Sequence, residues 1–77
     1  MFEMVEVESS NIRSIGWSPM GPVLKVVFRS KKEGVADTAY SYDGFPREKF
    51  EEFLTSPSKG TWFQKNVRGR YPTTKIQ

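Results

Sequence analysis

Residues 23–29 read VLKVVFR, the clearest strand pattern in the chain. Leu24, Val26 and Phe28 fall on one side of an extended backbone, and the intervening residues fall on the other. Because side chains alternate between the two faces of a strand, this pattern predicts a strand with one face in the core.

The segment that follows predicts a hairpin. Residues 31–34, Lys-Lys-Glu-Gly, are typical of a hairpin tip. Residues 36–42 then return as a second strand with Thr38, Tyr40 and Tyr42 on one face. These two strands predict the centre of an antiparallel meander.

The segment before residue 23 extends this meander. Two prolines flank a glycine within residues 18–22, which predicts a turn because proline has no amide hydrogen. Before the turn, residues 11–17 are an extended candidate, and Val5 and Val7 alternate with glutamates. The two segments predict either two strands or one bent strand.

A first helix is expected after the meander. Pro46 suits the first helical position, and Phe50, Phe53 and Leu54 form one apolar stripe before Pro57 ends the helix.

A second, shorter helix follows. Ser58 can cap it, Phe63 and Val67 point inward, and Gly69 is a plausible stop. Residues 71–76 then run extended, either as an edge strand or as a loose tail.

Together these elements predict an α+β fold: a three- to four-stranded antiparallel β-meander followed by two short C-terminal helices packed on the sheet. With 77 residues, the chain is long enough for one domain, residues 1–77, with a modest core. The expected core comprises Ile15, Leu24, Val26, Phe28, Phe50, Phe53, Leu54 and Phe63.

The surplus positive charge lies at the C-terminal end. The formal net charge of +3 combines +5 in residues 59–77 with −2 in residues 1–58. Aromatic residues, including Trp62 and Tyr71, lie between the cations, so phosphate is the leading candidate for an anionic partner. Residues 59–77 contain no acidic residue and five basic ones: Lys59, Lys65, Arg68, Arg70 and Lys75.

The sequence has no cysteine and no histidine, which removes several classes of function. Zinc fingers, Cys or Ser/His nucleophile pairs and imidazole acid–base catalysis are excluded. We interpret Glu48, Glu51 and Glu52 as a solvated helix surface, because nothing completes a metal or acid–base site around them. We therefore expect no enzymatic activity, no metal and no cofactor.

The N-terminal segment is acidic and has no long apolar run. It predicts neither a signal peptide nor a mitochondrial targeting sequence, and no transmembrane segment is expected anywhere in the chain. We expect a cytoplasmic protein without a membrane partner, and a monomer is favoured.

Two aromatic pairs are candidate contacts. Tyr40 and Tyr42 could stack bases, although packing in the core is the favoured interpretation. Trp62 and Phe63 diverge by about 100° on a helix, so one of them is expected to be exposed. We assign Phe63 to the core with Val67, and Trp62 is then either a binding residue or a lid over the core.

Arg68 and Arg70 are candidate phosphate contacts, because a guanidinium is planar and can bind an oxyanion with two hydrogen bonds. The alternative for Arg68 is a structural role at the end of the second helix. Lys59, Lys65 and Lys75 would add phosphate attraction without sequence information.

The order of the motifs extends over about residues 7–76 and is Ser9-Ser10-Asn11-Ile12, Ile15-Gly16, Tyr40-Ser41-Tyr42, Phe45-Pro46, Phe50, Leu54, Ser58, Gly60, Phe63, Val67-Arg68 and Tyr71-Pro72. This order resembles the KTSC family, a short domain named for the C-terminus of some lysyl-tRNA synthetases that also occurs as a stand-alone bacterial or phage-type protein. Residues 30–37 form a longer hairpin than is usual in the family, and Phe45 and Gln64 replace a small aliphatic residue and an asparagine.

The resemblance implies a possible RNA-binding role. Our leading hypothesis is a non-catalytic module for RNA or single-stranded nucleic acid. The alternative is a small protein-interaction accessory factor that docks on an acidic partner, since Trp, Tyr and Arg are enriched at interface hot spots. A basic groove with exposed rings would favour nucleic acid, and a flat apolar patch around Trp62 would favour protein. The expected contacts are Trp62, Lys65, Arg68, Arg70, Tyr71 and Lys59, with Tyr40 and Tyr42 beside them.

Overall fold

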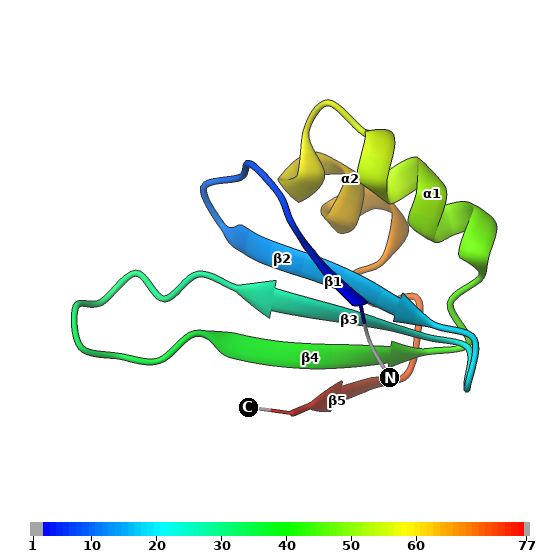
Figure 1. Cartoon of the computed structure of the whole chain (residues 1–77), viewed down its shortest axis with the longest axis horizontal. Helices are drawn as coiled ribbons and strands as arrows, with labels where there is room; N and C mark the ends of the chain where they lie inside the picture. The colour runs from blue at the N-terminus through cyan, green and yellow to red at the C-terminus, as the bar shows by residue number, and fades with distance from the viewer. Residues whose placement is uncertain (1–2, 77) are drawn as a thin grey trace.

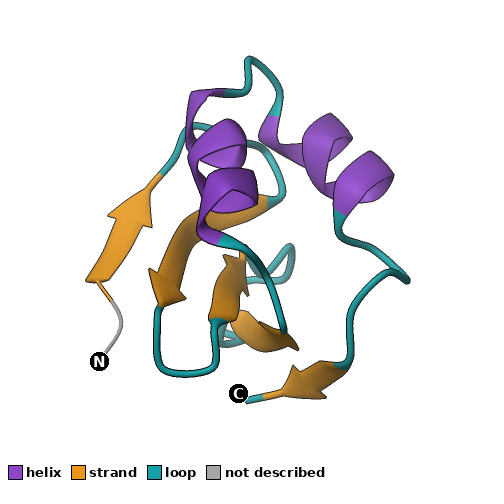
Figure 2. Cartoon of the chain, turned by 90° about the vertical axis from the view of Figure 1, so that its right-hand side faces the viewer, coloured by secondary structure: helices purple, strands orange, loops and turns teal. Residues whose placement is uncertain are grey.

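A computed structural model describes residues 3–76 of the chain. It contains an antiparallel sheet and two helices that lie on the same side of it (Figures 1 and 2). In chain order the elements are β1 (Glu3–Glu6), β2 (Ile12–Ser18), β3 (Val23–Phe28), β4 (Thr38–Asp43), α1 (Arg47–Thr55), α2 (Lys59–Asn66) and β5 (Thr73–Lys75).

The sheet is a simple meander in which each strand pairs with the next along the chain. Its order is β1-β2-β3-β4-β5, and every pair is antiparallel. Leu24 lies opposite Tyr42, and Val26 lies opposite both Ile15 and Tyr40. Because opposite residues share a face, Leu24 and Val26 point toward the helices together with their partners.

The predicted α+β fold is therefore confirmed, with five strands where three or four were expected. Two features add strands. The N-terminal segments form β1 and β2 as separate strands, and the tail adds β5 at the edge beside β4. The tail is ordered because Thr73–Lys75 pairs with β4, and the Ile76 amide donates to the Ala39 carbonyl at 2.8 Å.

The second helix begins where the sequence indicates, and the first begins one residue later than expected, at Arg47. Pro46 is the N-cap of α1, without a side-chain capping bond. Ser58 is the N-cap of α2, and its hydroxyl accepts a hydrogen bond from the Thr61 amide at 3.4 Å. This hydroxyl satisfies one of the amides that the first turn of a helix leaves without a partner.

The core lies between the sheet and the two helices. Ile15, Leu24, Val26, Phe53 and Phe63 are buried, as expected. The other three expected core residues lie at the margin of the core and are half-buried: Phe28, Phe50 and Leu54.

Phe45 is a core residue that the sequence analysis did not include, and it is 0% exposed. It follows Gly44, whose φ of +78° is a backbone conformation that residues other than glycine rarely adopt. The Trp17 indole Nε1 donates to the Phe45 carbonyl at 2.7 Å, and the Phe45 ring packs edge-on against Tyr71 at 4.9 Å. The turn therefore directs an aromatic ring into the core from an irregular segment.

Candidate functional site

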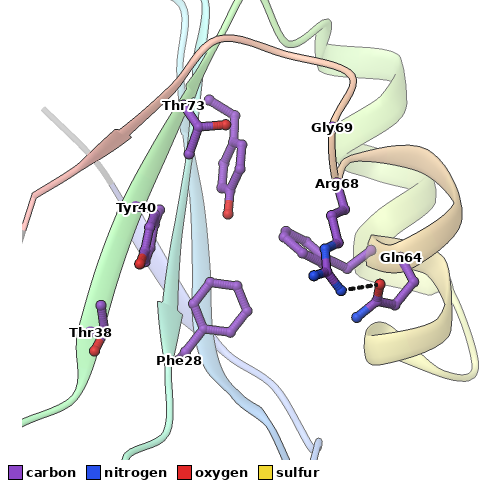
Figure 3. A pocket seen from close by; sticks show the side chains of 9 residues that line it. Phe28, Thr38, Tyr40, Gln64, Arg68, Gly69 and Thr73 are labelled. Carbon is purple, nitrogen blue, oxygen red and sulfur yellow. Dashed lines mark hydrogen bonds between the residues drawn. The ribbon is translucent and has the colours of Figure 1, made fainter.

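A groove of about 440 Å³ opens between the helix-facing side of the sheet and the C-terminal end of α2. Figure 3 shows its two walls: Tyr40 and Phe28 project from β4 and β3, and Arg68 and Gln64 lie across from them on the α2 side. We call this the aromatic groove; its lining residues are Phe28, Thr38, Tyr40, Tyr42, Phe63, Gln64, Arg68, Gly69 and Thr73.

The sheet wall consists of aromatic rings that pack edge-to-face. Phe28 packs edge-on against Tyr40, with ring centroids 5.9 Å apart, and against Phe63 at 5.3 Å. Edge-to-face contacts of this kind favour defined ring orientations. Tyr40 and Phe28 are only half-buried, so part of each ring remains accessible within a held arrangement.

The α2 wall carries hydrogen-bond donors. Arg68 Nη1 donates to Gln64 Oε1 at 3.0 Å, one turn earlier along the chain. The backbone is held here because the amides of Val67 and Arg68 both donate to the Phe63 carbonyl, at 2.9 and 3.1 Å. Gly69, with a φ of +73°, then turns the chain away toward β5.

Cations extend from the groove along the same end of the molecule. Lys75 lies directly opposite Tyr40 in the β4–β5 pair, so the two side chains share a face. Lys65 and Arg70 are exposed, and Arg70 Nε donates to the Lys65 carbonyl at 2.9 Å. Among the described residues, no carboxylate lines the groove.

The ion pairs lie elsewhere. Within residues 3–76 they join Arg13 to Asp37, Arg47 to Glu51 and Lys49 to Glu52. Among residues 3–76, none of these ion pairs includes a cation of α2, of β5 or of the segment between them, and Lys59, Arg68 and Arg70 donate to neutral oxygens instead. An uncancelled charge of this kind attracts anions.

Tyr40 and Arg68 are brought together in the groove, as the binding hypothesis requires. Tyr42 is different, because it is 4% exposed and belongs to the core. This burial confirms packing in the core, the favoured interpretation for Tyr42, and removes its ring from the expected stacking contacts. Burial, with a smaller effect from Tyr40, raises the pKa of Tyr42 to about 12, so its hydroxyl stays protonated at neutral pH.

Trp62 is half-buried, which favours the lid over the core among the two alternatives left open for it and removes it from the expected contacts. Its ring stacks on Phe53 with a centroid distance of 4.8 Å and an interplanar angle of 15°. It also packs edge-on against Phe45 at 6.3 Å. Trp62 and Phe63 can both contact apolar groups because α1 lies beside α2, so the divergent Trp62 direction meets Phe53. Trp62 therefore covers the core.

The remaining expected contacts divide between two places. Tyr71 is half-buried against Phe45, so it also contributes to the core. Lys59 lies at the other end of α2 from the groove, where its Nζ donates to the Ser56 carbonyl at 2.6 Å. Lys65 and Arg70 remain at the groove end of α2.

Phe28 and Gln64 are groove residues that the sequence analysis did not assign to the site. Phe28 was expected in the core, since its alternation with Val26 predicts only the face on which it lies. Gln64 was noted only as a departure from a family pattern. Phe28 pairs with Thr38, which shares a strand face with Tyr40, and this pairing places Phe28 in the groove. Finding it requires knowledge of the strand register.

No group of three or more His, Cys, Asp or Glu side chains within residues 3–76 could hold a metal ion. In that same part of the chain, no helix has the length and apolar character needed to span a membrane.

Comparison with known proteins supports the family resemblance. The chain matches the KTSC domain over residues 8–71. It is also similar to the crystal structure of a KTSC domain protein from Yersinia pestis, with a TM-score of 0.87 and 30% sequence identity over 100% of both chains. A search of curated proteins finds no match. This chain therefore belongs to the KTSC domain family.

Proposed function

We propose that this protein is a non-catalytic, cytoplasmic module that binds single-stranded nucleic acid, with RNA as the main target. The observation that carries the proposal is the aromatic groove, which places the accessible rings of Tyr40 and Phe28 opposite the Arg68 guanidinium. Proteins that bind single strands combine aromatic rings for base stacking with cations that follow the backbone.

The groove and its surroundings supply both parts. A base that enters the groove stacks on the partly exposed Tyr40 ring, which is worth about 1–3 kcal/mol per base in single-strand binding. Its phosphates then lie within the positive region of Lys75 on one side and of Lys65 and Arg70 on the other. Attraction of this kind weakens as salt concentration rises.

Double-stranded DNA fits less well. Proteins commonly read a major groove with a helix that presents one exposed face to the bases. The cationic helix α2 has eight residues, with Phe63 buried and Trp62 stacked on Phe53. Its two aromatic side chains are therefore used in packing, and its exposed face is short.

The alternative function, docking on an acidic protein partner, has less support from the geometry. A protein interface would be favoured by a flat apolar patch around Trp62, but this ring is half-buried against Phe53. The exposed large apolar side chains among residues 3–76 lie on separate elements: Val5, Met20, Val35 and Ile76. They do not suggest one continuous apolar surface.

The test is a fluorescence anisotropy titration of labelled single-stranded RNA, single-stranded DNA and duplex DNA of mixed sequence, at two salt concentrations. We expect micromolar or tighter binding of the single strands, weaker binding at higher salt, and loss of binding in the Tyr40→Ala, Arg68→Ala double variant. The matched control is an Arg47→Ala, Lys49→Ala double variant, which removes two cations from α1 and should bind normally. Absence of single-strand binding at low salt would refute the proposal.

A further inference from the structure

The α2 wall of the aromatic groove presents donors rather than acceptors. Gln64 Oε1 accepts the hydrogen bond from Arg68 Nη1, so the Gln64 amide nitrogen is left to donate outward. Arg68 uses one of its five N–H donors in this bond, and the other four remain for a ligand. The hydrogen bond from Arg68 fixes the orientation of the Gln64 side-chain amide, because only the amide oxygen can accept from a guanidinium.

The opposite wall presents ring surface. Phe28 and Tyr40 are half-buried and held edge-to-face. The donors and the rings face each other across a volume of about 440 Å³ (Figure 3). This volume lies within the range of about 300–1,000 Å³ that is typical of small-molecule sites. The groove is therefore suited to a planar group with apolar faces and an acceptor-rich edge.

We propose that the aromatic groove binds one unpaired guanine base of an RNA strand. The base stacks on the face of the Tyr40 ring, with the perpendicular Phe28 ring beside it, and turns its O6 and N7 edge toward Arg68. This inference rests on the proposed single-strand binding function and specifies which base that site selects.

Guanine matches the donors better than the other bases. O6 and N7 are two adjacent acceptors, which a guanidinium can bind with two parallel hydrogen bonds. Adenine presents the N6 amino donor beside N7, so a donor would face Arg68 and Gln64. Pyrimidines have a single ring and cover less of the Phe28 and Tyr40 surface.

The flanking phosphates have cations within the same arrangement. Lys75 shares the face of Tyr40 from the neighbouring strand, and it is exposed. A strand that passes over β5 with one base in the groove therefore brings its backbone past this lysine. Contacts of this type position the strand and carry no sequence information.

The experiment compares four RNA heptamers, each an adenine strand with guanine, adenine, cytosine or uracil at the central position. We expect the guanine heptamer to bind about 5- to 150-fold more tightly than the other three, the discrimination typical of one good bidentate contact. Arg68→Lys retains the charge but not the planar fork, so it should abolish the preference while leaving the salt dependence unchanged. The matched control, Arg70→Lys, should keep the preference.

The outcomes separate the two proposals. Equal binding of all four heptamers, or a preference for another base, would overturn the guanine inference and leave single-strand binding intact. A guanine preference that survives Arg68→Lys would also overturn the inference, because it assigns base recognition to Arg68. No binding of any heptamer would refute the proposed function as well. Circular dichroism of both variants establishes that each is folded.

Discussion

The two helices are nearly equal in length but differ in whether their cations form ion pairs with carboxylates. On α1, Arg47 pairs with Glu51 at 3.4 Å, and Lys49 pairs with Glu52 at 3.9 Å. Helix α2 contains no carboxylate, and Lys59 within it and Arg68 and Arg70 just beyond its end donate to neutral oxygens. The positive charge is therefore largely cancelled on α1 and retained on α2.

This difference shows which end of the molecule is suited to an anion. Both helices contribute to one core, through Phe53 from α1 and Phe63 and Trp62 from α2. Packing therefore does not explain why α2 has no carboxylates. The proposed anion binding would explain it, because an acidic neighbour would reduce the attraction of Lys65 and Arg70 for phosphate.

The largest expected effect comes from breaking the contact between the helices. Phe53 is fully buried and stacks on Trp62. Replacing a buried Phe with Ala costs about 3–5 kcal/mol. A domain of this size has about 3–5 kcal/mol of stability in total, so Phe53→Ala should be largely unfolded at 25 °C.

Urea unfolding followed by circular dichroism measures this effect. Phe50→Ala is the matched control, because Phe50 lies on the same helix and is only half-buried, and it should lose less stability. A loss below about 1 kcal/mol in Phe53→Ala would contradict the shared core of the two helices.

The next largest effect is on RNA affinity. Tyr40→Ala removes the accessible ring of the sheet wall, so the free energy of binding should weaken by about 1–3 kcal/mol. This corresponds to a rise in Kd of about 5- to 150-fold. The same anisotropy titration measures it, with Tyr40→Phe as a control that keeps the ring. If Tyr40→Ala bound RNA as tightly as the parent protein, base stacking in the groove would be excluded.

The two helices also differ in whether a side chain caps the N-terminus. Ser58 caps α2 through the Thr61 amide, whereas α1 has no side-chain cap. Ser58→Ala should lower the free energy of unfolding by about 1 kcal/mol, the usual cost of losing such a cap. Ser58→Asp, which restores an acceptor, should recover most of the loss in urea unfolding. Equal stability of Ser58→Ala and the parent protein would show that the cap contributes nothing.

A variant with a smaller expected effect on RNA affinity tests the difference in charge between α1 and α2. Gln64→Glu would place a carboxylate four residues before Arg68 and give α2 an ion pair like those of α1. RNA affinity should fall by about 1 kcal/mol or less, since exposed ion pairs are worth about 0.2–1 kcal/mol. The slope of log affinity against log salt should also become shallower by about 0.7, the value for one lost phosphate contact with a single strand.

The control for Gln64→Glu is Glu51→Gln on α1, which leaves Arg47 without its carboxylate. This variant should change neither the affinity nor the salt slope. An unchanged salt slope in Gln64→Glu would contradict the role assigned to the uncancelled positive charge at this end of α2.

The smallest expected effect is on stability and comes from the ion pair between Arg13 and Asp37, which lies outside both helices. The Asp37 carboxylate accepts a hydrogen bond from the Ser30 amide at 2.7 Å and pairs with Arg13. The Ser30 amide, followed by Arg13, lowers the pKa of Asp37 below its ordinary value of 3.8. The charged form is thus favoured by folding, so its contribution is complete above the ordinary pKa and is lost as pH falls through the lowered one.

Unfolding curves of the parent protein and Asp37→Asn at pH 7 and pH 2.5 check this effect. The parent should be more stable than the variant at pH 7, and the difference should shrink at pH 2.5. A difference that is the same at both values would exclude the carboxylate as its cause.

Much of the sheet could be predicted because its signals are local. The alternation of Leu24, Val26 and Phe28 predicts β3, and Pro46 and Ser58 mark the starts of the helices. The resemblance of the motifs to the KTSC family added the order of the elements. The strand β5 was left open as an edge strand or a loose tail, because only pairing with β4 orders it.

The site was harder to predict because it depends on contacts between distant elements. Whether Trp62 is exposed depends on where α1 lies, since Phe53 provides the surface that covers it. The burial of Phe45 depends on the Gly44 turn and on Tyr71, which is distant in sequence. Tyr40 and Arg68 could be proposed as contacts from residue type, but their meeting in one groove with Phe28 and Gln64 required the structure.

The central claim is that single-stranded RNA binds at the aromatic groove and the adjacent carboxylate-free end of α2. Its most direct test is a ¹⁵N–¹H correlation NMR titration of the protein with a mixed-sequence single-stranded RNA octamer. The account predicts the largest shift changes at Phe28, Tyr40, Gln64, Arg68 and Thr73, with α1 and β1 little changed. Changes centred on α1 and β1, or none at all at millimolar RNA and low salt, would contradict it.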